Sequence, residues 1–312
     1  MAKQRQKSDD SVRYDRFVGL DVNDNGVKSS LGEGAIWLSK AMNVNITRKF
    51  GVQRRSGFVL WKSGNYYTLW GNGSVCYGST VDSIVSFKKD ATSTTVVTGI
   101  NGVGVRFADA QNGVVYWSNG ARIGKLVGDV ASELGTSSDQ FKITMPAGDL
   151  LSFYSPYLLV VKGRFLYISD PINRDVYHRT QGFIAFKSNV RMVAAVGKTL
   201  FISDNEELWS LQRINMQLEV ARPMFRQDRV RNYPAIVGDN VRYVYGAATD
   251  KKQYPVGALF ATERGLCIAG EDGGVEDLSE GKYNMPAAME AAYAETLRDG
   301  DLNLYIAVIK GA

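Results

Sequence analysis

The sequence predicts an all-β protein, and more specifically a β-propeller of five or six blades with an irregular N-terminal extension. The first observation is a repeated octet: "GRFLYISD" at residues 163–170 returns as "GKTLFISD" at residues 197–204, with five of eight positions identical. The second is composition, because 32 glycines punctuate runs of aromatic and β-branched residues, a pattern that favours short strands joined by tight turns. The third is that weaker copies of the octet recur along the chain.

The recurring unit is an apolar residue, an aromatic residue, a variable residue, a small residue and usually a polar one. Its aromatic positions are Tyr77, Tyr116, Tyr167, Phe201, Phe260 and Tyr305, at spacings of 39, 51, 34, 59 and 45 residues. Each run follows a glycine or asparagine, as the second arm of a hairpin would, and its alternation places one face on a core. Irregular recurrence of this kind fits a propeller, in which each blade is a four-stranded sheet with loops of variable length.

Three regions are predicted. Residues 1–15 are expected to be a disordered basic arm, residues 16–62 a docking or closing segment, and residues 63–312 the propeller. Within the second region, residues 35–42 look helical and "NVNIT" looks like a strand. At the C-terminus, "AYAETLRDGDLNLYIAVIKG" predicts a hairpin around Asp299 and Gly300 that could receive an N-terminal strand, although the Ala-rich text before it also has helix propensity.

Positive charge is concentrated at the N-terminus. Residues 1–62 hold 12 Lys and Arg against 6 Asp and Glu, a net charge of +6, so the remaining residues carry a net charge of −1. This asymmetry indicates an acidic partner, either nucleic acid or an acidic protein surface; the alternative is a solvated arm that aids solubility.

Two basic clusters are the candidate interface or DNA-facing residues. They comprise Arg48, Lys49, Arg54 and Arg55 in "TRKFGVQRRSGF", and Arg222, Arg226, Arg229 and Arg231 in "ARPMFRQDRVRNYP". Arginine is favoured where phosphates or carboxylates are bound through two hydrogen bonds. The alternative is that these arginines pair with acidic residues across subunit or blade interfaces. Neither cluster is arranged to distinguish bases, so any DNA contact is expected to be nonspecific.

Three segments resemble calcium-, phosphate- or dinucleotide-binding motifs, but each lacks a residue that its motif requires. "DVNDNG" at residues 21–26 matches the first half of a calcium-binding loop, but Gly32 stands where a bidentate Glu is required, which favours a polar surface turn. "VGKT" at residues 196–199 has Met192 where a phosphate-binding loop needs glycine, and "GVGVRF" ends on Phe107 where a dinucleotide fingerprint needs glycine.

Catalytic and metal-binding constellations are not evident either. The single histidine, His178, lies in a polar run predicted to be a surface loop, and Cys76 and Cys267 are expected to be reduced, buried thiols. Glu206 and Glu207 are assigned to a solvated hairpin turn. We therefore expect no enzymatic activity, cofactor or metal. We also expect neither a membrane span nor secretion, because the sequence has no long apolar stretch and no signal-like N-terminus.

The segment "VGLDVNDNGVKSSLGEGAIWLSKAMNVNITRKFGVQRRSGF" resembles a bacteriophage virion family whose signature falls here on Gly19 and Leu20, Gly34 and Ala35, Asn43 and Val44, Gly51, and Arg54, Arg55 and Gly57. "NGVVYWSNG", "QGFIAF", "MVAAVGKTLFISD" and "LFATERGLCIAGEDGGVEDLSEGKYNMP" extend the resemblance over most of residues 16–310.

The resemblance implies a tail hub, nozzle or neck-ring component similar to packaged-DNA stabilisation proteins. Such a protein is a β-propeller that forms a ring, expected to hold six copies, around the DNA channel below the portal. Its partners would be the portal or adaptor and other tail proteins, with possible nonspecific DNA contact and no membrane; it would be made in the bacterial host cytoplasm and end in the virion. At 312 residues the chain is short for nozzle and hub proteins, which leaves its station along the tail open. The alternatives are a propeller glycosidase or lyase that degrades polysaccharide, and a monomeric propeller scaffold.

Overall fold

The protein is all-β: every regular element of the part that the computed structural model describes is a strand. The structure describes residues 16–20, 35–38, 44–46, 52–54, 62–72, 74–217, 222–231, 242–245, 255–262, 265–278, 289–299 and 302–311. The predicted fold class is thereby confirmed, and no described helix is present that could cross a membrane.

Five antiparallel sheets of four strands each, here called blades 1 to 5, follow one another along the chain. Blade 1 contains β5 (Thr68–Gly71), β6 (Cys76–Ser79), β7 (Ser83–Phe87) and β8 (Ser93–Thr98); blade 2 contains β9 (Arg106–Asp109), β10 (Val114–Ser118), β11 (Ile123–Val127) and β12 (Val130–Ser132). Blade 3 contains β14 (Leu150–Tyr154), β15 (Tyr157–Lys162), β16 (Phe165–Ile168) and β18 (Phe183–Ala185). Blade 4 contains β19 (Met192–Val196), β20 (Thr199–Ser203), β21 (Leu208–Gln217) and β22 (Arg222–Arg231); blade 5 contains β23 (Arg242–Tyr245), β24 (Pro255–Thr262), β25 (Gly265–Gly270) and β26 (Val275–Asp277).

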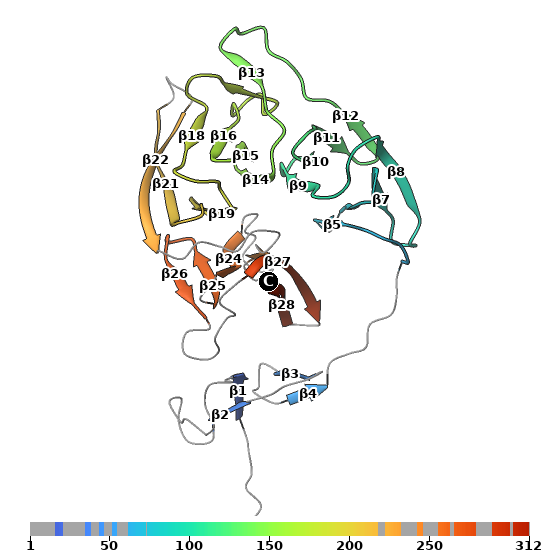
Figure 1. Cartoon of the computed structure of the whole chain (residues 1–312), viewed down its shortest axis with the longest axis vertical. Coiled ribbons are helices and arrows are strands. Elements are labelled where there is room, and N and C mark those ends of the chain that lie inside the picture. Colours follow the sequence, from blue (N-terminus) through green and yellow to red (C-terminus); the bar gives the residue numbers. More distant parts are fainter. Residues whose placement is uncertain are drawn as a thin grey trace, which may run out of the picture.

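The sheets fan about a common axis, and the first strands of blades 1 to 4, which are β5, β9, β14 and β19, lie nearest the centre (Figure 1). The inner strand β14 contacts β9 on one side and β19 on the other, and β19 contacts β24. Hydrophobic clusters fill the spaces between successive blades, which explains why second strands such as β10, β15 and β20 are buried on both faces. This arrangement is a β-propeller.

The C-terminal hairpin is also confirmed. β27 (Met289–Asp299) and β28 (Leu302–Gly311) pair antiparallel, with Asp299 opposite Leu302 at the turn. The hairpin lies in the sector between blade 5 and blade 1 (Figure 1). The count of five or six blades stays a prediction, because it depends on whether this two-stranded sheet is completed to a sixth blade.

The N-terminal region contains strands rather than the helix predicted over residues 35–42. β1 (Arg16–Leu20) pairs in parallel with β2 (Ala35–Leu38), and β3 (Val44–Ile46) pairs antiparallel with β4 (Val52–Arg54). The helix prediction is wrong for residues 35–38 because Ile36 and Trp37 favour a pleated strand once a partner strand is present. The strand predicted at "NVNIT" is confirmed, and these four strands lie outside the fan (Figure 1).

The repeated octet turns out to occupy two different positions in a blade. Five of the six predicted aromatic units lie on the second strand of their sheet, whereas Tyr167 lies on β16, the third strand of blade 3. On the second strand of blade 3, the position that matches Phe201 is Leu159: each lies opposite the third residue of the first strand, faces the next blade and is fully buried. With Leu159 in place of Tyr167, the spacings become 39, 43, 42, 59 and 45 residues, a nearly regular repeat with one long interval.

Candidate functional site

The second predicted basic cluster lies on one strand. Arg222, Arg226, Arg229 and Arg231 all fall within β22, which is the outermost strand of blade 4. Among the described strands β22 pairs only with β21, so its other edge borders no described strand. An edge strand exposes a row of backbone N–H and C=O groups to any partner chain.

Blade 4 extends outward beyond the length of its inner strands. β20 has five residues, and its pairing with β21 ends where Thr199 lies opposite Gln212. Beyond that point β21 and β22 continue as a two-stranded ribbon, from Arg213 opposite Phe225 to Gln217 opposite Arg222. Figure 1 shows the two long strands at the rim of the fan.

The ribbon and the edge strand are basic. Residues 212–231 contain five arginines against Glu219 and Asp228, a net charge of +3, although residues 63–312 as a whole are close to neutral. Guanidinium groups bind carboxylates and phosphates in the same bidentate geometry. The strand therefore offers backbone pairing and anion recognition together.

The first basic cluster is only partly described. Arg54 is the last residue of β4, while Arg48, Lys49 and Arg55 lie outside the described residues. The polar turn predicted at residues 21–26 lies outside them as well. Of this cluster the structure therefore places only Arg54, on a strand outside the fan (Figure 1).

A buried carboxylate joins blades 2 and 3. Asp175 is 6% exposed and accepts hydrogen bonds from the hydroxyl of Tyr116 at 3.0 Å, from Lys125 Nζ at 2.5 Å and from the backbone N–H of Gly135 at 2.7 Å. Burial alone would raise the pKa of Asp175, but these donors outweigh it and hold the pKa below its ordinary value. Burial, and then the nearby charge of Asp175, raises the pKa of Tyr116.

This trio of carboxylate, phenol and amine resembles an acid–base site, but its geometry is that of a cross-link. The donors converge on Asp175 from blade 2, and the carboxylate is too buried to reach a substrate. The same boundary role is filled elsewhere by Tyr77, whose hydroxyl donates to the carbonyl of Gly128 at 2.6 Å, and by Tyr154, whose hydroxyl donates to the carbonyl of Lys198 at 2.6 Å. Polar bonds between blades therefore stabilise the fan.

A small side sheet lies outside blade 3 and was not foreseen from the sequence. β13 (Lys142–Thr144) pairs antiparallel with β17 (Val176–His178). Lys142 Nζ lies 2.7 Å from Asp170 Oδ2. Burial alone would raise the pKa of Asp170, but the hydrogen bond from Lys142 helps to lower it overall. No local pattern marked this pairing, because strands β14 to β16 of blade 3 separate β13 from β17 along the chain.

His178 lies at the end of strand β17, not in the surface loop that was predicted. Its ring is stacked on Phe141, with centroids 5.9 Å apart and 6° between planes, and its Nδ1 is 3.2 Å from the hydroxyl of Thr180. The polar residues around it made the run look like a loop, but cross-strand pairing with Lys142 orders the backbone. A single imidazole stacked on a phenyl ring, with no carboxylate bonded to it in the described contacts, is not arranged as a general base.

Exposed apolar side chains gather on this side of blade 3. Phe141 is 50% exposed, Ile143 41% and Phe183 38%. Phe183 also contacts the rings of Phe165 and Tyr167 on β16, with centroids 5.9 and 6.1 Å away. These residues form a second exposed surface, which is apolar where β22 is basic.

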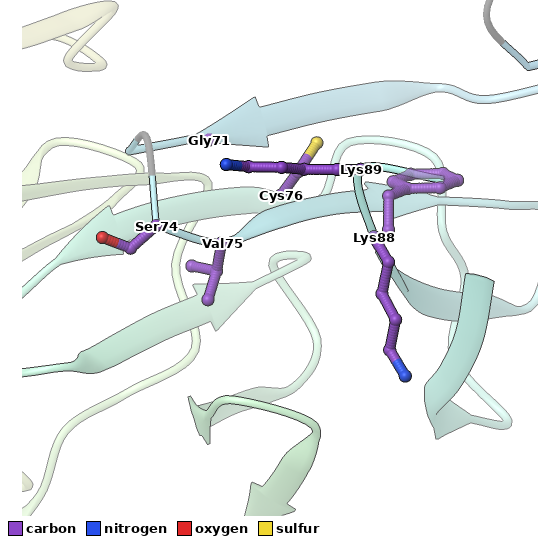
Figure 2. Close-up of a pocket in the computed structure, with 7 residues that line it drawn as sticks. Gly71, Ser74, Val75, Cys76, Lys88 and Lys89 are labelled. Carbon is purple, nitrogen blue, oxygen red and sulfur yellow. The ribbon is translucent and has the colours of Figure 1, made fainter. Parts of the chain in front are cut away.

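A hollow of about 210 Å³ lies against blade 1 (Figure 2). It is lined by Gly71, Ser74, Val75, Cys76, Phe87, Lys88 and Lys89. Its size is below the range of about 300–1,000 Å³ usual for small-molecule sites. The lining contains two amines and a thiol but no carboxylate or imidazole, so it lacks a paired acid and base.

Neither cysteine forms a disulfide among the described residues; Cys267 is buried, as predicted, whereas Cys76 is only half-buried. Burial raises the pKa of Cys76, which disfavours the reactive thiolate. Glu206 and Glu207 lie in the hairpin turn between β20 and β21, as predicted, and both donate their backbone N–H groups to Asp204 Oδ1 at 2.8 Å. Within the described part of the chain no three His, Cys, Asp or Glu residues cluster as metal ligands would.

Comparison with known proteins bears on the fold. No protein-family model matches the sequence, and no curated protein matches it. Among solved structures, BBS1N in complex with ARL6DN is similar at 10% identity and a TM-score of 0.51, covering 83% of this chain and 79% of that one. The Neurospora crassa Pan2 WD40 domain matches at 9% identity and a TM-score of 0.41 over 78% and 74% of the two chains.

A gluconolactonase from Xanthomonas campestris matches at 11% identity and a TM-score of 0.45, over 76% and 82% of the two chains. At such identities the likeness speaks for the fold alone, and proteins of this fold have many unrelated activities. The sheet topology shows that the chain is a β-propeller, and the likeness to BBS1N, with a TM-score above 0.5, is a likeness of fold.

Proposed function

We propose that the protein is a structural component of a bacteriophage virion, at the tail hub, nozzle or neck ring. Copies of the chain assemble side by side into a ring, expected to hold six copies, around the DNA channel below the portal. The proposal starts from the sequence resemblance over residues 16–310, and the propeller fold is the one that the resemblance implies.

The observation that carries the proposal is the basic edge strand β22. Four arginines lie on a ten-residue outer strand whose far edge borders no described strand. Blade 5 carries the complementary charge, with Glu271, Asp272, Glu276 and Asp277 within its outer hairpin. A basic patch on one copy and an acidic patch on the next make a heterologous contact, which is the kind that closes rings.

Rigid building blocks suit this role. Every boundary between the described blades is filled by a hydrophobic cluster, and each of the four boundaries also has a side-chain hydrogen bond, the last being from Thr199 to the carbonyl of Glu271 at 3.1 Å. A scaffold that does not deform transmits the ring geometry from one copy to the next.

The test is charge reversal on β22. The double variant Arg226→Glu and Arg229→Glu should remain a folded monomer where the unaltered protein forms a ring, because the contact between arginines and the acidic hairpin is replaced by repulsion. Size-exclusion chromatography with light scattering measures the mass, and circular dichroism checks the fold. The matched control is Lys88→Glu with Lys89→Glu, two exposed lysines after β7 in blade 1, which makes the same charge change away from blade 4 and should leave the ring intact.

Two results would contradict the proposal. One is a stable monomer for the unaltered protein at micromolar concentration and in lysates of infected cells. The other is turnover of a polysaccharide by that monomer, which would favour the propeller hydrolase instead.

A further inference from the structure

The C-terminal hairpin is half a blade. Each of the five preceding sheets has four strands, but β27 and β28 form a sheet of two among the strands that the structure describes. β27 contacts the inner strand β23 of blade 5, which leaves β28 on the outer side. In the described strands, the outer edge of β28 has no partner over ten residues, "LNLYIAVIKG", and these contain a single charge, Lys310.

A long apolar edge of this kind pairs readily with another strand, and proteins normally cover it. The chain carries a suitable cover outside the fan. β3 and β4 form a short antiparallel pair, with Asn45 opposite Gln53, and adding two strands to β27–β28 would make four, the number in every other blade.

We propose that the β3–β4 pair of one copy adds to the outer edge of β28 in a second copy of the chain, completing a sixth blade. The inference rests on the proposed ring, to which it adds a second contact between neighbours besides that of β22 with the acidic hairpin. Strand addition of this kind takes its affinity from main-chain hydrogen bonds, and passing the same segment from each copy to the next gives a heterologous contact.

Three observations support this strand addition, and the first of them favours a second copy as the source of the strands. Within one chain, β3 and β4 pair with each other and lie apart from the fan and from β28 (Figure 1). Thirteen residues, 55–67, separate β4 from β5, and they span up to about 45 Å when extended, enough to reach a neighbouring propeller. The segment up to residue 62 carries a net charge of +6, whereas blade 5, beside the hairpin, carries four carboxylates between residues 271 and 277.

Disulfide trapping tests the proposal on the full-length chain. One chain carries a cysteine in the N-terminal pair, Asn45→Cys or Gln53→Cys; the other carries one on β28, at Asn303, Tyr305 or Ala307. Paired strands place opposite Cα atoms about 4.5–5.5 Å apart, within the range that a disulfide bridges. The two chains are co-expressed with different tags and oxidised, and a non-reducing gel resolves cross-linked dimers.

Both native thiols are removed first, as Cys76→Ser and Cys267→Ala, and thermal melts confirm that every variant folds. Ala131→Cys on β12, an exposed outer strand of blade 2, replaces the β28 cysteine in the matched control. We expect a cross-linked dimer that contains both tags for at least one of the three cysteine positions on β28. We expect no such dimer when the second chain carries Ala131→Cys instead.

A chain that carries both cysteines separates the two topologies. If it oxidises only to a closed monomer, and the two-chain mixture gives no dimer, the segment closes its own propeller and the proposal is wrong. Absence of any cross-link would also overturn it. Light scattering on the same samples tells whether the ring itself persists, so failure of this contact is distinguishable from failure of the proposed function.

Discussion

Single side chains determine how firmly the blades are joined, and Asp175 is the clearest case. Its carboxylate lies at the boundary of blades 2 and 3 and binds three donors. Breaking a buried ion pair is costly because the remaining charge loses its partner. Here the cost is moderated, since the Lys125 side chain is 28% exposed and regains some hydration.

We predict that Asp175→Asn lowers the free energy of unfolding by about 2–3 kcal/mol at pH 7. The folded pKa of Asp175 is depressed, so its stabilisation is present above the unfolded pKa of about 3.9 and is lost as pH falls through the folded value. The difference between the urea midpoints of the unaltered protein and the variant should therefore be smaller at pH 3 than at pH 7. A difference that is as large at pH 3 as at pH 7 would argue against ionic stabilisation.

Asp204 presents the opposite situation. It is 1% exposed, and its Oδ1 accepts the N–H groups of Glu206 and Glu207, but its Oδ2 has no hydrogen-bond partner among the described residues. Asn119 holds the corresponding turn of blade 2 through its amide oxygen, which accepts from Ala121 and Arg122. An amide is therefore sufficient for this turn.

We predict that Asp204→Asn changes the free energy of unfolding by no more than about 1 kcal/mol, because the turn is kept and the unpaired buried oxygen is exchanged for an amide nitrogen that is equally unpaired. Asp204→Ala should instead lose about 1–2 kcal/mol with the two turn bonds. Thermal melts at pH 7 compare the three proteins. If the Asn variant proves as unstable as the Ala variant, Oδ2 must have a partner.

At the scale of elements, the octet shows why sequence similarity and structural equivalence diverge. Both copies end in a buried serine followed by an aspartate that caps a turn: Asp170 accepts from Ile172 and Asn173 as Asp204 does from its own turn. This local requirement is the same at the end of a second or a third strand. The octet sequence therefore repeats even though β16 is the third strand of its blade and β20 the second.

We predict that the core position of the repeat in blade 3 belongs to Leu159. Leu159→Ala should cost about 2–5 kcal/mol by leaving a cavity between blades 3 and 4, and Phe201→Ala about 3–5 kcal/mol between blades 4 and 5. Tyr167→Ala should cost less than either, because Tyr167 is only half-buried and contacts the exposed ring of Phe183. Chemical denaturation measures the loss of unfolding free energy in the three variants. If Tyr167→Ala costs as much as Phe201→Ala, the two octets are structurally equivalent and the prediction is wrong.

Much of the fold was predictable from short-range patterns. Glycine turns and alternating strands predicted the blades, and the Asp-Gly pair at residues 299–300 predicted the turn of the C-terminal hairpin. In that hairpin, strand pairing outweighs the helix propensity of the alanines. The side sheet β13–β17 and the outward ribbon of β21–β22 were not predictable, because each depends on pairing between segments whose own patterns are weak. Only the ribbon has a counterpart in the spacing of the repeat, because the longest interval, 59 residues between Phe201 and Phe260, contains β21 and β22.

The candidate site was predictable in composition but not in place. Sequence identified the arginines of residues 222–231 as a cluster, and the structure adds that they share one outer strand. Their position at the rim follows from the order of strands in blade 4, which no local pattern encodes. Residues 48, 49 and 55 stay a prediction, since they lie outside the described part of the chain.

For the whole molecule, the two ends of the chain and the rim of blade 4 are the features that a lone propeller does not explain. A closed propeller needs its last sheet completed, yet β27–β28 has two strands and β1–β4 lie outside the fan. A basic edge strand and an acidic outer hairpin lie on consecutive blades. Both features are accounted for if the unit of function is a ring of copies.

The most direct test of this account is electron cryomicroscopy of phage particles produced from the genome that encodes this chain. Mass spectrometry of the same particles identifies their proteins. We predict that the chain is present in the particle as a ring of propellers below the portal, with strand β22 at the contact between neighbours. Purified, infectious particles that lack the chain, or that carry it as isolated propellers away from the channel, would contradict the account.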